Sequence, residues 1–177
     1  MNSYSITFLS IICYQIVNRA FAHYTVTVTS LLNSTDNWRF NIDIGQINGV
    51  VFVDLKKAFD TVDHSILISK LERYGLNELA LRLFSSYLEN RSQCCFVNGH
   101  LSHTLPINCG VPQGSILGPL LFLLFINDLP NCFSSGLVSM YADDTTVSFN
   151  ADNITTLEFL INKDLESLDK WLIANKL

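Results

Sequence analysis

The chain has 177 residues, of which 49% are hydrophobic and 15% are charged. This composition excludes a disordered or low-complexity protein, and the length suits one domain of ordinary size. The net charge is −5, with 11 Lys and Arg residues against 16 Asp and Glu residues, which argues against a simple basic nucleic-acid-binding module. The net negative charge comes from residues 101–177, which contain three basic and eight acidic residues. Such an acidic region needs cations, and a divalent metal is one source of them.

The N-terminal residues have only part of the pattern of a secretory signal. Residues 6–17 are apolar and are followed by Ala20-Phe21-Ala22, but residues 1–5 carry no Lys or Arg, whereas a signal peptide starts with a positive region. The apolar stretch is also shorter than the ~20 residues that cross a bilayer. We therefore expect no signal peptide, no stable membrane association and an intracellular location, in the cytoplasm or nucleus. The five cysteines include no C-x-x-C pair, so we expect free, buried thiols.

The first structural signals along the chain are mixed. Residues 25–32 alternate Val with Thr, which favours a strand, yet Val28, Leu31 and Leu32 also fit one face of a helix. Residues 50–53 are Val-Val-Phe-Val, which predicts a strand buried on both faces. This strand ends at Asp54.

Two helices are predicted after this strand. The first is capped by Asp63 or Ser65 and ends at Gly75. The second is capped by Asn77. The apolar face expected for the second helix comprises Leu79, Leu83 and Tyr87.

A hairpin, a loop and a buried helix come next. Asn98-Gly99, in the middle of residues 92–107, is the strongest short hairpin signal in the chain. A glycine-rich loop over residues 109–118 leads into a helix that is expected to begin at Pro119 and to stop at Pro130. This helix is apolar nearly all round, so we expect it to be buried.

The C-terminal part predicts a second hairpin and a final helix. Residues 138–149 form the hairpin, with Asp143-Asp144 at its turn. A capping box of Thr155 and Glu158 is expected to start the helix. The order of the elements predicts an α+β fold with antiparallel strand pairing.

Three features stand apart from packing. Asp54 ends a buried strand, where a carboxylate is costly unless it is paired or binds a metal. Asp143 and Asp144 are adjacent at a turn, where two like charges repel. The loop of residues 110–119 has three glycines and leads into a helix N-terminus, which favours anions. Each feature alone is better explained as an ordinary turn or connector. Together they supply oxygen ligands for two Mg²⁺ ions and a border for a nucleotide.

Three motifs in this chain resemble those of a known family. Residues 50–64, VVFVDLKKAFDTVDH, resemble motif A of the reverse transcriptases of non-long-terminal-repeat (LINE-type) retrotransposons. Residues 110–119, continuing to 126–130, resemble motif B, and Tyr-Ala-Asp-Asp at 141–144 matches motif C. The motifs occur in the order of the family, and their combination is far more specific than Tyr-x-Asp-Asp alone. The resemblance covers residues 23–177, and it favours a helix over residues 25–37.

The resemblance implies a catalytic metal centre made of Asp54, Asp143 and Asp144. These three carboxylates would hold two Mg²⁺ ions, for which Mn²⁺ can substitute. The implied reaction is attack of a primer 3′-hydroxyl on the α-phosphate of a deoxynucleotide, with release of pyrophosphate. The implied partners are an RNA template, a DNA primer and deoxynucleoside triphosphates.

The resemblance also implies residues that bind substrate. Phe59 is the bulky gate that excludes a ribose 2′-hydroxyl, and Gln113 and Gly114 border the nucleotide and the template. A four-residue segment lies with its backbone under the triphosphate: Leu55, Lys56, Lys57 and Ala58.

Some of these assignments have alternatives. Lys56 and Lys57 fit either a solvated pair or contacts with phosphates. Phe59 also fits a plain core aromatic. His64 is expected to be structural, because two-metal transfer needs no imidazole.

The chain also departs from the family. It has no convincing match to the basic fingers motifs, and it ends before the later palm elements and the thumb. We therefore expect a polymerase palm-type antiparallel sheet with packed helices, truncated fingers and no thumb. Residues 1–22 are assigned to a segment outside the family, and residues 23–177 to a partial reverse transcriptase domain.

The expected function is that of an RNA-directed DNA polymerase domain from a retrotransposon, with little activity as a fragment. The alternative is a non-catalytic retrotransposon remnant that at most binds nucleic acid or a partner. A different two-metal nucleotidyl enzyme, such as a cyclase, is disfavoured by the loop of residues 110–119.

Overall fold

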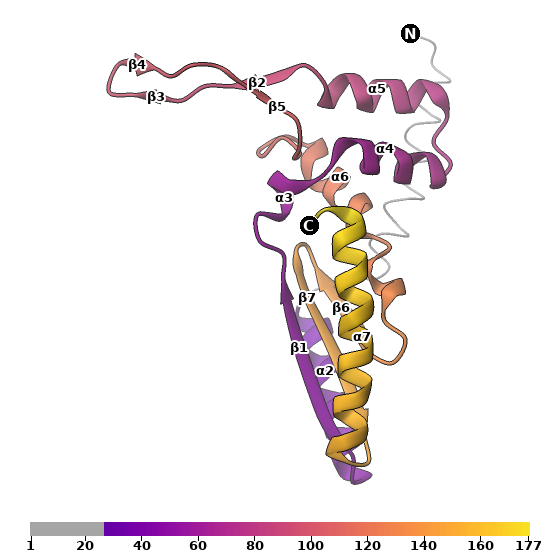
Figure 1. Cartoon of the computed structure of the whole chain (residues 1–177). Coiled ribbons are helices and arrows are strands. Elements are labelled where there is room, and N and C mark those ends of the chain that lie inside the picture. Colours follow the sequence, from indigo (N-terminus) through magenta and orange to yellow (C-terminus); the bar gives the residue numbers. More distant parts are fainter. Residues whose placement is uncertain (1–26) are drawn as a thin grey trace. The chain divides into compact units, whose positions relative to one another are not determined.

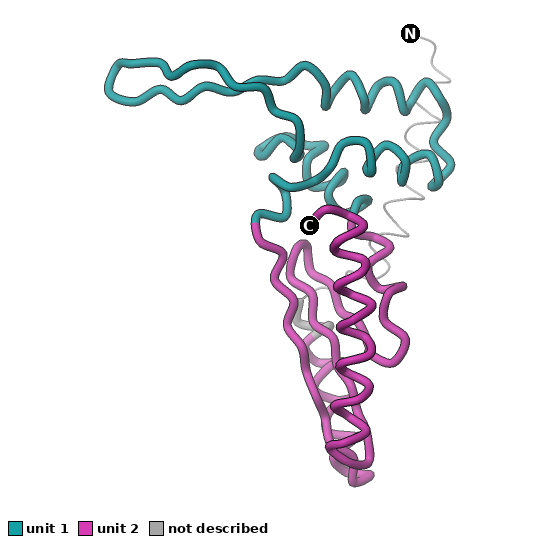
Figure 2. The backbone as a smooth tube through the Cα atoms, in the orientation of Figure 1, with its two compact units in different colours: residues 1–14, 57–125 teal, residues 15–56, 126–177 magenta. Residues whose placement is uncertain are grey.

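The computed structural model of the chain describes residues 27–177, which divide into two compact units (Figure 2). Of the described residues, unit 1 holds 57–125 and unit 2 holds 27–56 together with 126–177. Residues 6–17, which the sequence analysis compared with a signal peptide, and the expected segment of residues 1–22 lie outside the described residues.

Unit 2 is built on a three-stranded antiparallel sheet in the order β1-β7-β6. The strands are β1 (Ile47–Asp54), β6 (Leu137–Tyr141) and β7 (Asp144–Ala151). Two helices, α2 (Thr27–Asp43) and α7 (Ile154–Asn175), lie on opposite faces of this sheet (Figure 1). The ambiguous residues 25–32 therefore fall on a helix from Thr27 onward, as the motifs favoured.

The two faces of the sheet differ in chemistry, because successive side chains of a strand point to opposite faces. The face under α7 is apolar. Its core cluster comprises Val147, Phe149, Ala151 and Leu157. The face under α2 is polar: the Trp38 indole Nε1 donates to Ser148 Oγ at 3.1 Å, and Asn48 Nδ2 donates to the Trp38 carbonyl at 2.9 Å.

The expectation that residues 50–53 are buried on both faces is wrong. Phe52 is 76% exposed. β1 is an edge strand, and the contacts of α2 reach the sheet at Asn48 and Ser148. Phe52 lies four residues further along β1, on this same face, where nothing in the described part of unit 2 covers it. On this face Asn48 and Val50 are half-buried, so the exposure begins at Phe52 and is confined to the end of the strand.

Unit 1 contains the helices α3 (Ala58–Thr61), α4 (His64–Arg73), α5 (Glu78–Leu88) and most of α6 (Leu117–Ile126). The expected burial of α6 is confirmed, since residues 121–126 are all buried. This helix begins two residues before Pro119, because Ser115 Oγ accepts the Gly118 N–H at 2.9 Å and starts the turn early. It is followed by the 3₁₀ helix η1 (Leu129–Cys132), which contains Pro130.

The expected helix caps are confirmed in two of three cases. Asp63 caps α4 by accepting the N–H groups of Ser65 and Ile66, and Asn77 caps α5. Helix α7 is capped by Asn153, so the expected capping box of Thr155 and Glu158 is wrong.

The expected apolar face of α5 is also wrong. Leu79 is 65% exposed and Leu83 is 53% exposed. The buried face is displaced by one residue along the helix and comprises Ala80, Phe84 and Leu88.

The predicted Asn-Gly hairpin is confirmed and projects as a long ribbon from unit 1 (Figure 1). Its outer pair is β3 (Phe96–Val97) with β4 (His100–Leu101), and its inner pair is β2 (Arg91–Gln93) with β5 (Leu105–Ile107). Asn98 and Gly99 have φ values of 51° and 81°, as a two-residue turn of this kind requires.

The four cysteine thiols within residues 27–177 are free, as expected, but three of them are exposed. Cys94, Cys95 and Cys109 are exposed because they lie on the hairpin ribbon and the loop that follows it. Cys132 is partly buried, and this burial raises the pKa of its thiol to about 11. Cys13 lies outside the described residues.

The architecture confirms the predicted fold class, a mixed α+β fold with antiparallel sheets. Within residues 27–177, none of the helices has the length and apolar character needed to span a bilayer.

Candidate active site

Asp54 and Asp144 are paired directly across the sheet of unit 2. Asp54 is the last residue of β1, and its register partner is Asp144, the first residue of β7. Directly opposite residues of an antiparallel pair project their side chains on the same face, with Cβ atoms about 4.5–5.5 Å apart. A metal centre of the kind that the motifs imply requires the end of the motif A strand to lie beside the second hairpin, and the register confirms this placement.

Asp143 lies beside this pair in the loop of the hairpin. Tyr141 pairs with Asp144, so Ala142 and Asp143 form a two-residue loop between β6 and β7. Ala142 has φ of 53°, a left-handed conformation that costs a non-glycine residue about 1–2 kcal/mol. Such strain persists where the surrounding structure imposes it. Here the left-handed conformation of Ala142 allows the tight two-residue loop that carries Asp143.

The three carboxylates have no compensating partner among residues 27–177. Asp54 and Asp144 are exposed, and Asp143 is half-buried. The hydrogen bonds and ion pairs within the described part of the chain do not involve these three side chains. That part also contains no group of three or more His, Cys, Asp or Glu side chains gathered closely enough to hold a metal ion. The register thus brings Asp54 and Asp144 together, and a site made of all three carboxylates stays a prediction.

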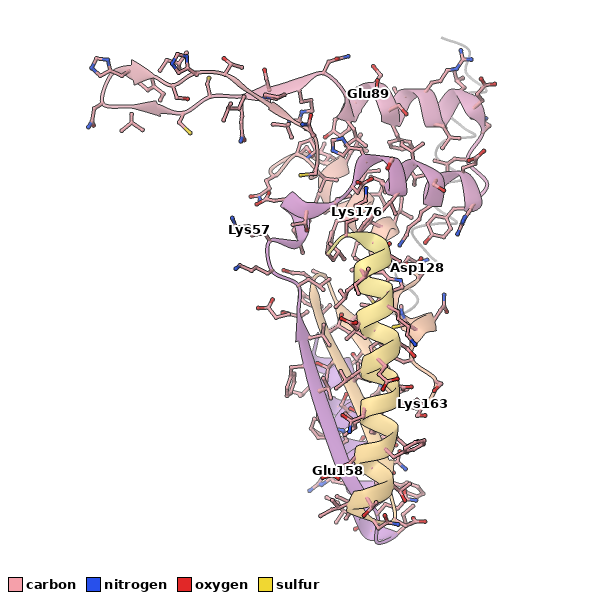
Figure 3. The ribbon with its side chains drawn as sticks, viewed as in Figure 1. Lys57, Glu89, Asp128, Glu158, Lys163 and Lys176 are labelled. Atoms are coloured by element: carbon pink, nitrogen blue, oxygen red, sulfur yellow. The ribbon has the colours of Figure 1, made fainter. Side chains whose placement is uncertain are left out.

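The segment after Asp54 alternates between burial and exposure. The Leu55 and Ala58 side chains are buried, with exposed fractions of 7% and 3%, whereas Lys56 and Lys57 are exposed. Lys57 has φ of 53° and forms the left-handed N-cap of α3. Figure 3 shows its side chain projecting from the turn that leads into α3. Leu55 and Ala58 therefore offer only backbone to a ligand, while both lysines also offer ammonium groups.

Phe59 is held by the core of unit 1 on one side. Its ring stacks on Phe122 of α6, with centroids 4.3 Å apart and an interplanar angle of 30°. Phe122 is fully buried and Phe59 is half-buried. Phe59 is thus packed in the core and also partly exposed. Its position is compatible both with a gate that excludes a 2′-hydroxyl and with a plain core aromatic.

Gln113 is held by Asp60, which was not among the expected site residues. Its Nε2 donates to Asp60 Oδ1 at 2.8 Å. No local pattern links these residues, because they are 53 positions apart. Gly114, the neighbour of Gln113, is exposed and left-handed with φ of 76°.

The loop that carries Gln113 is fixed to the segment around α3. The N–H groups of Gly110 and Val111 donate to the carbonyls of Val62 and Phe59, each at 2.8 Å. A Cβ added to Gly110 would lie 2.8 Å from the Asp60 carbonyl oxygen, so only glycine allows this approach. His64 Nε2 lies 2.8 Å from the Gly110 carbonyl, which supports its expected structural role.

The expected site residues divide between the two units. Unit 2 holds Asp54, Leu55, Lys56, Asp143 and Asp144. Unit 1 holds Lys57, Ala58, Phe59, Gln113 and Gly114. The carboxylates thus share one unit, and the gate candidate shares the other with the glycine-rich loop.

Comparison with known proteins identifies the family. The family model described as reverse transcriptase (RNA-dependent DNA polymerase) matches residues 9–177. The chain belongs to this family, and the resemblance inferred from the three motifs is confirmed. The match includes residues 9–22, which the sequence analysis placed outside the family; that boundary stays a prediction.

Several curated relatives of the chain come from mobile elements. The chain is 35% identical over 127 residues to the RNA-directed DNA polymerase from mobile element jockey of Drosophila melanogaster, covering 68% of this chain. It is 34% identical over 134 residues to the probable RNA-directed DNA polymerase from transposon BS of the same species, again covering 68% of the chain. A polyprotein from the type-1 retrotransposable element R2 of Popillia japonica is 29% identical over 85 residues, which cover 48% of the chain. In each case the matched region spans only 14% of the relative.

Proposed function

We propose that the chain is the palm-type catalytic part of an RNA-directed DNA polymerase from a retrotransposon, which transfers nucleotides through two metal ions. The observation that supports this most strongly is the register pairing of Asp54 with Asp144. Two carboxylates on one face, without a partner among the described residues, repel each other unless a cation lies between them. In a polymerase of the proposed kind, such a cation would take part in nucleotide transfer.

The register pair of Asp54 and Asp144 supports binding of such ions. Mg²⁺ is usually bound through one or two carboxylates together with water and substrate phosphates, so a complete protein cage is not required. Asp54, Asp144 and the adjacent Asp143 would hold the two Mg²⁺ ions, and Mn²⁺ would substitute. When bound, the ions would lower the pKa of the primer hydroxyl and neutralise charge on the phosphates.

The other residues bind and orient the substrates. The primer 3′-hydroxyl attacks the α-phosphate of the deoxynucleotide and pyrophosphate leaves. The backbone of residues 55–58 lies under the triphosphate, and Gln113 and Gly114 border the nucleotide and the template. Asp60 fixes the Gln113 amide at 2.8 Å, so this group is oriented before the nucleotide arrives.

Phe59 selects the sugar in this proposal. Its ring stacks on the buried Phe122, so it does not move aside easily. A rigid aromatic beside the nucleotide would exclude a 2′-hydroxyl.

The rival is a non-catalytic remnant that at most binds nucleic acid or a partner. The matched region is 14% of the length of the jockey and BS relatives, so the 177 residues are tested here without most of such a protein. Positioning of reactants can contribute ~7–11 kcal/mol to lowering a barrier. We therefore expect little extension by the 177 residues alone.

Primer extension tests the proposal. The chain is assayed by itself and in a chimera in which it replaces the matching segment of the jockey relative. We expect Mg²⁺-dependent extension by the chimera, its abolition by Asp144→Ala, and incorporation of ribonucleotides by Phe59→Ala. A folded chimera that fails to extend primers would establish the remnant.

A further inference from the structure

Unit 1 contains a cleft of about 760 Å³, and few of its lining residues belong to the proposed catalytic site. Its walls are α3 with the turn before it, the inner strands β2 and β5 of the hairpin ribbon, and the loop that follows β5. Two of its lining residues, Lys57 and Gln113, are candidate substrate-binding residues. The others include Arg91 at the base of the ribbon, which neither the motifs nor the proposed mechanism uses.

The cleft is lined by two cations of unit 1. Two of the lysines and arginines between residues 57 and 125 line it, Lys57 and Arg91. The full set in that range is Lys57, Lys70, Arg73, Arg82 and Arg91.

The two cations of the cleft lack a protein partner. Arg82 pairs with Glu78, whereas the Lys57 and Arg91 side chains form no hydrogen bond or ion pair with any other of residues 27–177. Arg91 is nevertheless half-buried. A half-buried guanidinium without an anion loses hydration and gains nothing in return. This favours a ligand that brings the anion.

One carboxylate, Asp60, lines the cleft, and it forms no ion pair with Lys57 or Arg91. Asp60 Oδ1 accepts the Gln113 amide at 2.8 Å. The charge of the lining is therefore two positive against one negative, in a chain whose net charge is −5. The remaining polar side chains of the lining are neutral: Thr61, Ser92, Gln93, Asn108, Cys109 and Gln113.

The cleft is also rigid on one side. The backbone bonds of Gly110 and Val111 to the α3 segment fix the loop wall, and Gly110 lies against Asp60 too closely for a side chain. A preformed wall lowers the ordering cost of binding. The planar guanidinium of Arg91 offers paired donors that match two phosphate oxygens.

We propose that this cleft binds phosphate groups of the polymerase substrates, with Arg91 as a positioning residue and Lys57 as the second cation. The inference rests on the proposed function, since it takes the ligand from that reaction. The phosphates belong either to the backbone of a single-stranded template or to the triphosphate of a nucleotide. Both carry the same chemistry, and the test separates them.

Binding of a short single-stranded RNA and of dTTP to the full chain is measured in EDTA by fluorescence anisotropy and competition. Without metal ions, the result does not depend on the carboxylates, so failure of the catalytic proposal leaves the measurement intact. The variants are Arg91→Gln and Lys57→Gln. Arg82→Gln is the matched control, because it removes an equal charge from the same unit outside the cleft.

Arg91→Gln is expected to lower the affinity of the chain for one of the two probes by roughly ten-fold, because one charge-assisted hydrogen bond is lost. If the RNA is affected, the slope of log affinity against log salt falls by about one, and the site takes template phosphates. If dTTP alone is affected, it takes the triphosphate. Arg91→Lys retains the charge without the paired donors and should recover only part of the loss. The proposal is overturned if Arg91→Gln behaves like Arg82→Gln with both probes, or if the wild-type chain binds neither.

Discussion

Asp54 and Asp144 face each other as the last residue of β1 and the first residue of β7. This relationship depends on strand register, because a shift of one residue would turn either side chain to the other face of the sheet. The apolar side chains on the α7 face oppose such a shift, since Val51 is paired with Val147 and both contribute to the core there. The packing of one face therefore fixes the carboxylates on the other.

The first prediction compares two left-handed glycines in the loop of residues 109–118. Gly114→Ala places a Cβ in open space and costs only the left-handed backbone, about 1–2 kcal/mol. Gly110→Ala incurs the same backbone cost and also a Cβ 2.8 Å from the Asp60 carbonyl oxygen. We expect Gly110→Ala to lower the free energy of unfolding clearly more than Gly114→Ala in urea titrations. Equal losses would mean that the loop does not lie against α3.

The second prediction concerns Asp164, which is fully buried on α7. Its carboxylate accepts the N–H groups of Ser134, Ser135 and Gly136 at 2.9–3.2 Å and the Ser134 hydroxyl at 2.8 Å. Asp164→Asn replaces one acceptor oxygen by a donor. We expect it to cost about 1–3 kcal/mol in unfolding free energy. Asp169→Asn, an exposed change on the same helix, should cost almost nothing; a similar loss from both would contradict the assignment.

The Asp164 carboxylate also gives stability a pH dependence. Burial raises the pKa of this carboxyl, but the hydrogen bonds from Ser135, Ser134 and Gly136 outweigh it and hold the pKa below the ordinary 3.8. A lowered pKa means that the unfolded chain binds the proton more readily. The contribution is therefore complete above the ordinary pKa and is lost as the pH falls through the folded value. Acid titrations of the wild type and Asp164→Asn should converge at low pH.

The third prediction concerns Lys70, a buried lysine on α4. Its Nζ donates to the Phe125 carbonyl at 2.6 Å and lies 4.8 Å from the centroid of the Phe125 ring. This carbonyl belongs to the last turn of α6, where helix carbonyls lack partners within the helix and cations are favourable. Lys70→Met should cost about 1.5–3 kcal/mol. Arg73→Met, on the exposed side of the same helix, serves as control in the same denaturant titration. Lys70→Met matching this control would show that the contact adds no stability.

The sequence predicted the order of elements and the juxtaposition of the motif A strand with the second hairpin, because both follow from local patterns and a known motif order. It did not predict which face of α5 is buried. Leu79 and Leu83 are as hydrophobic as the residues one position later, and only packing within the fold selects Ala80 and Phe84. Hydrophobicity alone cannot separate two adjacent helical stripes.

The polar contacts of the site also could not be predicted from the sequence. The bond between Gln113 and Asp60 joins residues far apart in the chain, so no spacing rule indicates it. Phe52 was expected to be buried because a run of four β-formers is typical of strands covered on both faces, whereas the contacts of α2 reach this face of the sheet at Asn48 and Ser148. The extent to which a helix covers a sheet face is a property of the assembled fold and not of the strand.

The fourth prediction is that the carboxylate pair of Asp54 and Asp144 binds a divalent metal ion. A cation that binds only the folded chain stabilises it by mass action, by about 1.4 kcal/mol at ten times the dissociation constant. Mg²⁺ or Mn²⁺ at millimolar concentration should therefore raise the melting temperature of the wild-type chain. Asp143→Asn should weaken this shift if the hairpin loop contributes a ligand.

The most direct test of the central claim is Mn²⁺ binding, measured by electron paramagnetic resonance on the full chain. We predict that Asp54→Asn and Asp144→Asn each weaken Mn²⁺ binding by about ten-fold or more, because each removes a ligand charge. Asp169→Asn, which removes an equal charge from the exposed side of α7, should leave it unchanged. Equal Mn²⁺ affinity in the wild type and in both site variants would contradict a metal centre at Asp54 and Asp144.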